Sequence, residues 1–287
     1  MEHVIQNNGI ELCTESFGLA SDPPVLLAAG TSCSMDWWPP EFCTRLSSTG
    51  CRVIRYDQRD TGRSSFDPPG EPRYSMTGLV ADAVAVLDHL GVGSAHWIGF
   101  SQGGWVAQLA ALDQPLRVRT LTLMSTRPTG HGAPDDDLPD VTPALLEAWQ
   151  NGPSEPDWDD PEQVVEYLVK GEQSVCGAEF NEAHAREIAA RCVRRALQVV
   201  SAVTNHPLVA PAPRWRERLA SITAPTLVIH GTADPMFPIA NANALTREIP
   251  GARLQILEGV GHEFPPRVWD RVVGSLREHF RDRPARP

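Results

Sequence analysis

Short apolar segments alternate with amphipathic segments along most of this chain. The apolar segments predict strands. They cover residues 10–17, 25–29, 51–56, 95–100, 118–124, 226–230 and 253–257. Some of them, such as residues 25–29 and 95–100, are apolar at nearly every position, which is typical of strands buried on both faces of a largely parallel sheet.

The segments between these strands have the spacing of helices. In residues 77–90, apolar side chains such as Leu79, Ala83 and Leu87 recur on one side, and Gly91 ends the predicted helix. Further helices of this kind are predicted over residues 103–112, 239–249 and 267–280. Strands that alternate with helices predict an α/β protein whose sheet is covered by helices on both faces.

Residues 127–215 interrupt this alternation, because they contain no strand pattern. The segment has an acidic run at residues 135–137, which we interpret as a solvated loop rather than a metal site, and it closes on prolines. Helical patterns fill it near residues 142–150, 161–175 and 181–203. These features predict an inserted helical cap over 127–215, within a core domain formed by residues 1–126 and 216–287.

The strand at 95–100 runs into Gly99-Phe100-Ser101-Gln102-Gly103, and a predicted helix follows. A Gly-x-Ser-x-Gly sequence between a strand and a helix is typical of a nucleophile elbow. A serine hydroxyl is a weak nucleophile that has to be presented and activated, and the glycines leave room for the sharp turn. The start of the helix also favours developing negative charge. We therefore predict that Ser101 is a nucleophile.

A serine nucleophile needs a base to take its proton and a carboxylate to orient that base. Asp234 follows the strand at 226–230, and His262 follows the strand at 253–257 after Gly259-Val260-Gly261. The carboxyl ends of parallel strands share one edge of the sheet, where ligands bind in open α/β folds. The order serine, acid, histidine is also that of hydrolases with a nucleophile elbow. We predict His262 as the base and Asp234 as its orienting acid.

Other candidates for these roles fit less well. His230 ends its strand four residues before Asp234, and we interpret it as structural. The strand that ends at Met124 is followed by no carboxylate that could replace Asp234. Asp57 and Asp60 precede Ser101 in a polar loop, and we interpret them as organising that loop.

Attack on a carbonyl creates an oxyanion that needs hydrogen-bond donors already in place. The backbone N–H of Gln102, directly after the nucleophile, is one expected donor. The second is expected in the loop after the strand at 25–29, where Gly30 allows a sharp turn before Thr31. We predict the Thr31 N–H as the second donor.

Composition narrows the classes of partner. The 287 residues are 41% hydrophobic and 21% charged, which is ordinary for a globular protein of one large domain, or of a core with an insertion. A net charge of −11 would repel a phosphate backbone, so we expect no nucleic-acid partner. The N-terminus has no secretory signal pattern, and no apolar run approaches the roughly 20 residues that span a bilayer. We expect a cytoplasmic protein with no membrane partner.

The 6 cysteines form no CxxC pair and no Cys/His cluster with zinc spacing. We interpret them as buried, reduced thiols, with Cys33 in the loop beside the candidate site. We expect neither a metal nor a cofactor.

The motifs around Ser101, Asp234 and His262 give the chain a resemblance to the α/β-hydrolase superfamily from about residue 10 to residue 280. Residues 57–64 are similar to the family's D-x-R-G-x-G-x-S loop, with Asp60 where glycine is usual. Ala29-Gly30 stands where the family has His-Gly. The resemblance implies a mostly parallel sheet flanked by helices, with a helical cap inserted after the sixth strand.

Residues 38–42 and 55–64 resemble the branch of aclacinomycin methylesterases within this superfamily. Members of that branch remove a methyl ester from an aromatic polyketide during antibiotic biosynthesis. The resemblance implies hydrolysis of a carboxylic ester through an acyl-enzyme on Ser101, and a small hydrophobic ester as partner.

Apolar residues near the three catalytic candidates predict a substrate pocket, since flat apolar side chains suit an aromatic or acyl substrate. They are Met35, Trp37, Trp38, Phe100, Trp105, Met236, Phe237 and Phe264. Taken singly, each is as well explained by core packing.

Two alternatives to ester hydrolysis stay open at this point. The same three residues can act on a lactone, a thioester or a carbon–carbon bond, because the fold hosts many chemistries. The other alternative is a member of the fold that binds a ligand without hydrolysis, or that acts as a decarboxylase or cyclase. A peptidase whose acidic cap residues hold a substrate amine is less favoured. Neither the natural substrate nor the oligomeric state follows from the sequence.

Overall fold

The computed structural model describes residues 2–130, 132 and 134–281, and an eight-stranded sheet forms its core. The strands are β1 (Glu2–Asn7), β2 (Ile10–Phe17), β3 (Pro24–Ala28), β4 (Arg52–Tyr56), β5 (Ala95–Phe100), β6 (Val118–Met124), β7 (Thr226–Gly231) and β8 (Arg253–Leu257). Their order is β1-β2-β4-β3-β5-β6-β7-β8. The pairs β1–β2 and β2–β4 are antiparallel and all others are parallel. The expected α/β fold with a mostly parallel sheet is confirmed.

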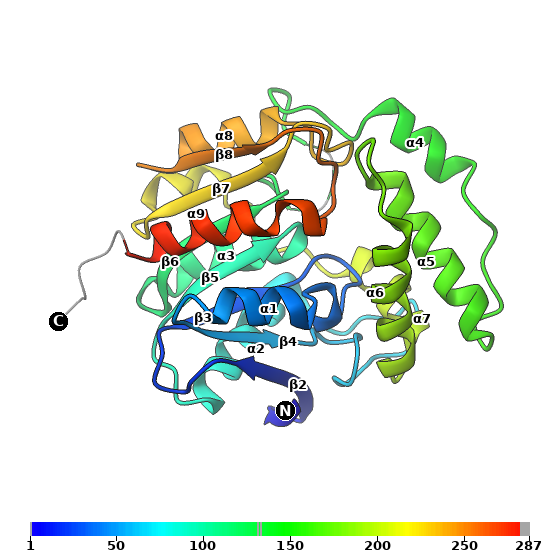
Figure 1. The fold of residues 1–287 in the computed structure, drawn as a ribbon, viewed down its shortest axis with the longest axis horizontal. Coiled ribbons are helices and arrows are strands. Elements are labelled where there is room, and N and C mark those ends of the chain that lie inside the picture. Colours follow the sequence, from blue (N-terminus) through cyan, green and yellow to red (C-terminus); the bar gives the residue numbers. More distant parts are fainter. Residues whose placement is uncertain (1, 131, 133, 282–287) are drawn as a thin grey trace.

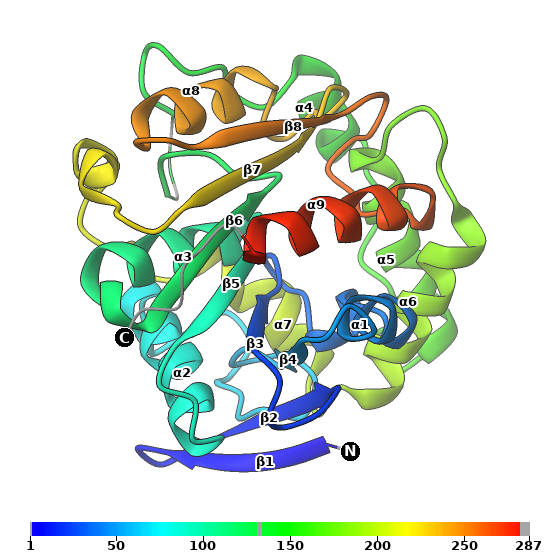
Figure 2. The ribbon, with the colours of Figure 1, turned by 60° about the vertical axis from the view of Figure 1, so that its left-hand side comes forward.

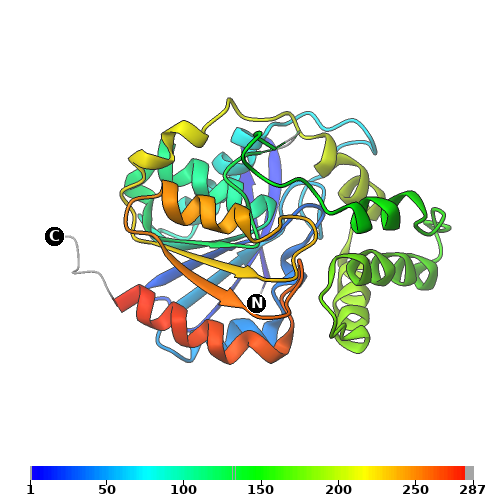
Figure 3. The ribbon, with the colours of Figure 1, turned by 90° about the horizontal axis from the view of Figure 1, so that it is seen from above.

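Helices cover both faces of this sheet (Figure 2, Figure 3). One face carries α1 (Pro40–Ser47) and α9 (Trp269–Arg281), and the other carries α2 (Met76–His89), α3 (Gln102–Asp113) and α8 (Ala240–Glu248). Successive strand residues point to opposite faces, so Leu26 joins the apolar layer under α2 and α3, while Leu27 joins the layer under α1 and α9. Short 3-10 helices are η1 (Met35–Trp37), η2 (Pro115–Arg117), η3 (His206–Leu208), η4 (Arg216–Ser221) and η5 (Pro266–Val268).

Among the described residues, four α-helices separate β6 from β7 and stand beyond the carboxyl ends of the parallel strands (Figure 1). They are α4 (Pro143–Gln150), α5 (Pro161–Val175), α6 (Glu182–Arg195) and α7 (Val199–Asn205). The side chains of Thr142, Asp160 and Asn181 accept backbone N–H groups at the starts of α4, α5 and α6, which defines where these helices begin. The helical insertion after the sixth strand is confirmed, and its division from the core at residues 127 and 215 stays a prediction.

The structure differs from the predicted elements in three places. Strand β1 was not predicted, because only Ile5 in it is buried; it joins β2 through a turn in which Asn8 and Gly9 both have positive φ. Helix α1 was not predicted either. The single helix expected over 181–203 is broken between α6 and α7, because the Leu197 N–H donates to the Gly62 carbonyl oxygen of the core (2.8 Å).

Candidate active site

Ser101 occupies the turn between β5 and α3, in a backbone conformation that side chains rarely adopt (φ 53°, ψ −119°). Two hydrogen bonds join the turn to the end of β6 and the residues after it: the Ser101 N–H donates to the Met124 carbonyl oxygen at 2.9 Å, and the Thr126 hydroxyl donates to the Ser101 carbonyl oxygen at 2.8 Å. A Cβ on Gly103 would lie 2.3 Å from the Ala28 carbonyl oxygen, so the turn requires glycine there. The backbone thus has the form of a nucleophile elbow.

Ser101, His262 and Asp234 form a hydrogen-bonded row at the carboxyl edge of the sheet. The His262 Nε2 atom is 3.0 Å from Ser101 Oγ, and His262 Nδ1 is 2.8 Å from Asp234 Oδ2. The three residues are exposed by only 6%, 6% and 3%. When Nδ1 carries the proton and donates to Asp234, Nε2 can accept the proton of the serine hydroxyl.

Hydrogen bonds hold Asp234 in its charged form. Its Oδ1 atom accepts the backbone N–H groups of Met236 (2.9 Å) and Phe237 (2.8 Å). Burial opposes the charge, but His262 and the hydrogen bonds outweigh burial and hold the pKa of Asp234 below its ordinary value. His230 supports the same loop, since its Nε2 lies 2.6 Å from the Phe237 carbonyl oxygen. Burial lowers the pKa of His230, so it serves here as a neutral ring.

The positions expected to bind an oxyanion lie beside this row. The loop after β3 is tight against the elbow, since a Cβ on Gly30 would be 3.3 Å from the Ser101 Cβ. Within the described residues the Thr31 N–H has no hydrogen-bond partner, and Thr31 lines a cavity. Gln102 is the first residue of α3, directly after Ser101. The roles of Thr31 and Gln102 as donors stay a prediction.

A buried glutamine fixes the backbone before Thr31. The Gln58 Nε2 group donates to the carbonyl oxygens of Ala29 and Gly30, both at 3.1 Å. Gln58 is fully buried in the polar loop that follows β4. It therefore anchors the loop after β3 to the loop after β4.

A buried histidine fixes the backbone after Thr31. His206 Nδ1 accepts the Ser32 N–H at 2.9 Å, and Nε2 lies 2.7 Å from the Arg59 carbonyl oxygen, to which it can donate. Burial lowers the pKa of His206, which keeps Nδ1 unprotonated and able to accept. Ser32 has a positive φ of 62°, a conformation that needs such support. His206 belongs to the segment between β6 and β7, so the insertion helps to shape the expected oxyanion loop.

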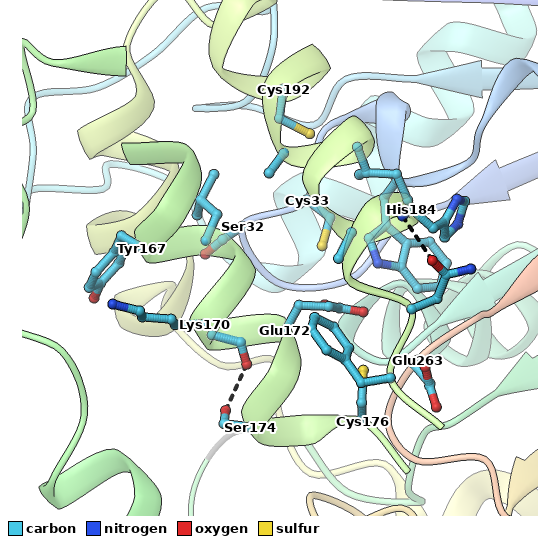
Figure 4. A pocket seen from close by; sticks show the side chains of 18 of the residues that line it. Ser32, Cys33, Tyr167, Lys170, Glu172, Ser174, Cys176, His184, Cys192 and Glu263 are labelled. Carbon is cyan, nitrogen blue, oxygen red and sulfur yellow. Dashed lines mark hydrogen bonds between the residues drawn. The ribbon is translucent and has the colours of Figure 1, made fainter. Parts of the chain in front are cut away.

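A cavity of about 490 Å³ lies between the loop after β3 and the helices α4, α5 and α6 (Figure 4). Its aromatic and larger aliphatic walls are formed by Trp37, Trp149, Tyr167, Leu168, Phe180, Ile188 and Phe264. Thr31 and Glu263 also line it, so the cavity borders the row at the expected oxyanion loop and at the residue after His262. Ser101 and His262 are not among its lining residues.

Of the eight residues predicted to form a substrate pocket, Trp37 and Phe264 line this cavity. The other six are not lining residues, and they pack in or against the core: Met35, Trp38, Phe100, Trp105, Met236 and Phe237. Phe100 and Phe237 flank the His262 ring, with ring centroids 5.0 and 5.2 Å from it. For these six, burial within the protein outweighed a place on a cavity wall.

The insertion also contacts the loop that carries His262. The His262 N–H donates to the Val175 carbonyl oxygen at the end of α5 (2.7 Å). Glu263 Oε1 accepts the Gly177 N–H at 3.0 Å. A Cβ on Gly261 would lie 2.4 Å from the Val175 carbonyl oxygen, so a glycine permits this close approach.

Arg195 ties the end of α6 to three acids of the core, of which Asp57 and Asp36 are buried. Its guanidinium pairs with Asp57 (2.9 Å), with Glu2 (2.9 Å) and with Asp36. Asp57 also accepts the backbone N–H groups of Met35 and Arg63. These contacts give Asp57 the loop-organising role that we predicted.

Asp60 has a similar role in its own loop. It accepts hydrogen bonds from the Tyr74 hydroxyl and the Asp67 N–H, both at 2.6 Å, and from the Asn205 amide at 3.1 Å.

The sequence patterns gave no specific role to Gln58, Arg195 or His206. Gln58 lies in a loop that we predicted to be structural, so the polar residues around it were a usable signal. Arg195 and His206 belong to the insertion, and no local sequence pattern there indicates which residues meet the core.

In the part of the chain that the structure describes, no group of three or more His, Cys, Asp or Glu side chains is placed to hold a metal ion. None of the helices in that part combines the length and apolar character needed to cross a membrane.

The fold and the row of Ser101, His262 and Asp234 have the arrangement of serine hydrolases on a parallel sheet. Residues 23–265 match the model of the family described as "alpha/beta hydrolase fold", and the chain belongs to that family. It is 34% identical to the rhodomycin D methylesterase of Streptomyces peucetius over 97% of both chains. It is 31% identical to a putative carbamate hydrolase of Variovorax paradoxus over 86% of this chain and 88% of that protein.

A solved structure described as an N-acyl homoserine lactone degrading enzyme is also similar. It has a TM-score of 0.72 and 29% identity, over 96% of this chain and 99% of that one.

Proposed function

We propose that this protein is a serine hydrolase that cleaves a carboxylic ester, with Ser101 as nucleophile, His262 as base and Asp234 as the orienting acid. The observation that carries the proposal is the 3.0 Å contact between Ser101 Oγ and His262 Nε2 at a strained elbow. Ester hydrolases among the relatives support the class of reaction.

In the proposed reaction, Ser101 Oγ attacks the ester carbonyl carbon while His262 Nε2 takes the hydroxyl proton. The backbone N–H groups of Thr31 and Gln102 would stabilise the resulting oxyanion. The carbon–oxygen bond to the alcohol then breaks, and His262 returns the proton to the departing alcohol. Water, deprotonated by His262, attacks the acyl-enzyme and releases the carboxylic acid and free Ser101.

We further propose that the ester is a methyl ester on an aromatic polyketide. The methylesterase relatives, which align over nearly the whole chain, support this substrate class. The cavity is also compatible with this substrate class, since its volume of about 490 Å³ and its aromatic walls suit a bulky, flat molecule.

The test is turnover of aromatic methyl esters in water enriched in oxygen-18. We expect the label in the carboxylic acid and not in the methanol, because the acyl–oxygen bond is the one that breaks. Ser101→Ala should reduce kcat by at least about 10⁴-fold, whereas Ser275→Ala, at a half-buried position on α9 away from the row, should not change it. A fluorophosphonate should label the wild type at Ser101. Undiminished turnover in Ser101→Ala would refute the assignment of the nucleophile.

A lactone is the second candidate substrate, favoured by the similarity to the lactone-degrading enzyme. The same steps open a lactone, with the alcohol retained on the product. A higher kcat/KM for acyl homoserine lactones than for aromatic methyl esters would select this alternative.

A further inference from the structure

Two carboxyl groups line the cavity on the side that borders the proposed nucleophile. Glu263 directly follows the proposed base, and Glu172 lies on α5. Figure 4 shows the Glu172 carboxyl group between Cys33 and Cys176, directed into the space that the lining residues surround. Cys33 belongs to the loop after β3 that we expect to bind the oxyanion. A carbonyl group attacked by Ser101 therefore lies on the side of the cavity that carries both acids.

Among the described residues, no neighbouring cation balances the charge of Glu172. The side chain is half-buried, and within those residues it forms no hydrogen bond and no ion pair. Arg267 lies 3.8 Å from Glu263 and is engaged there. In Figure 4, Lys170 and Tyr167 point away from Glu172, and the Lys170 ammonium group is 3.7 Å from an acid of its own helix. An ionised Glu172 thus gives this part of the cavity an uncompensated negative charge.

The other titratable groups around Glu172 are neutral near pH 7. Burial, with the charge of Glu172 itself, raises the pKa of the Cys33 and Cys176 thiols. Burial also raises the pKa of the Cys192 thiol and lowers the pKa of His184. Burial raises the pKa of Glu172 to about 7. The Glu172 side chain therefore changes from neutral to negative as the pH passes upward through about 7.

Glu172 interacts electrostatically with the loop that carries the proposed base. The imidazole of His262 opposes the rise of the Glu172 pKa, and the carboxyl group of Glu263 adds to it. A negative charge that forms at the reacting carbon, beside His262, is subject to the same interaction. Two like charges repel strongly where apolar walls keep the effective dielectric constant low.

Ester hydrolysis forms such a charge. The ester group of the substrate is neutral, whereas a product acid with an ordinary carboxyl pKa of about 4 is ionised at pH 7. We propose that the ionised Glu172 repels the product carboxylate and thereby prevents product inhibition, while the neutral ester binds unhindered. The inference rests on the proposed function, which places the ester carbonyl at Ser101. A neutral Glu172 can instead donate a hydrogen bond to the product carboxylate and retain it.

The test measures inhibition of methyl ester hydrolysis by an anthraquinone carboxylic acid and by its primary amide, which has nearly the same shape without the charge. At pH 8.5, Glu172→Gln should lower the inhibition constant of the acid about ten- to a hundredfold and change that of the amide less than about twofold. At pH 6, where Glu172 is mostly neutral, the same substitution should change both constants less than about threefold. His262 faces the ligand in both proteins, so its own titration cancels in this comparison.

Two further variants serve as controls. Glu162→Gln removes the same charge from the exposed start of α5 and should leave both inhibition constants unchanged. Glu172→Asp keeps the charge and should keep the weak binding of the acid at pH 8.5. The proposal is overturned if Glu172→Gln does not strengthen inhibition by the acid at pH 8.5, or strengthens inhibition by acid and amide alike. A gain for the acid that is as large at pH 6 as at pH 8.5 also overturns it.

Binding separates this proposal from the proposed function. The acid and the amide can be titrated calorimetrically at pH 8.5 against Ser101→Ala and Ser101→Ala/Glu172→Gln, with no turnover required. Weaker binding of the acid than of the amide, relieved by Glu172→Gln, supports repulsion of carboxylates even if no ester is hydrolysed. Equal binding of acid and amide to Ser101→Ala overturns it even if esters are hydrolysed.

Discussion

The row of Ser101, His262 and Asp234, which we propose is catalytic, and the cavity beside it are built by different parts of the chain. Ser101, Asp234 and His262 each follow a parallel strand, and the hydrogen-bonded sheet fixes their mutual distances. The cavity is lined mostly by α4, α5, α6 and their connections, which meet the sheet only at its carboxyl edge. Such an arrangement lets the substrate-contacting surface change while the chemical groups stay in place.

The largest expected effect concerns the three residues that follow strands of the sheet. Asp234→Asn should lower kcat by about 10³- to 10⁴-fold, because an amide in place of the carboxylate favours the wrong tautomer of His262. The fold should remain, as judged by circular dichroism. Asp270→Asn, an exposed carboxyl paired with Arg45, is the control and should leave kcat unchanged. A loss below tenfold in Asp234→Asn would contradict the assigned role.

The next effect tests how firmly the insertion is tied to the core. Arg195→Leu should lower the free energy of unfolding by about 3 kcal/mol, because it leaves buried Asp57 and Asp36 without their cation. Urea unfolding measures the change. Arg186→Leu on the same helix removes an exposed cation that pairs with Glu166 and Glu182, and it should have little effect. An equal loss of unfolding free energy in the two variants would show that burial of the Arg195 ion pairs does not add to their contribution to stability.

A smaller effect tests whether the insertion takes part in catalysis. His206→Leu should reduce kcat about 10- to 100-fold with KM within twofold, because the Ser32 N–H loses its acceptor and the loop that we expect to bind the oxyanion can shift. Affinity for a boronic acid, which mimics the tetrahedral intermediate, should fall in parallel. An increase in KM at constant kcat would instead place His206 in substrate binding.

The smallest effect lies at the edge of the insertion, where Asp135 pairs with Arg214 and Arg216. The hydrogen bond from Arg214, joined by Arg216, holds the pKa of Asp135 at about 2. Its stabilisation is therefore complete above the unfolded pKa near 3.9 and is lost as the pH falls toward 2. Asp135→Asn should cost about 1 kcal/mol or less at neutral pH, and less still in high salt.

Thermal unfolding from pH 7 to pH 3 measures this difference. Asp136→Asn is the matched control, because Asp136 forms no ion pair within the described ranges. A difference between Asp135→Asn and wild type that grows toward acid pH would contradict the expected sign.

The fold was predictable where patterns are local. Buried strands such as β5 and β7 are apolar at most of their positions. The sharp turn at Ser101 needs glycines, which can be recognised directly in the sequence. Strand β1 was not predicted, because an edge strand with one buried residue has almost no pattern of alternating apolar and polar positions. The break after α6 was not predicted either, because it depends on a hydrogen bond to the carbonyl oxygen of Gly62, which is distant in the sequence.

The sequence by itself determined the alternation of strands and helices, the position of the insertion, and the loops that carry Ser101, Asp234 and His262. Periodicity, turn residues and the common edge of parallel strands are enough for that, because they act over a few neighbouring residues or follow from the topology. Only the tertiary structure decided which aromatic residues line the cavity, and that His206 and Arg195 face the core. Those outcomes depend on how amphipathic helices dock, and their own sequence does not encode the surface that they meet.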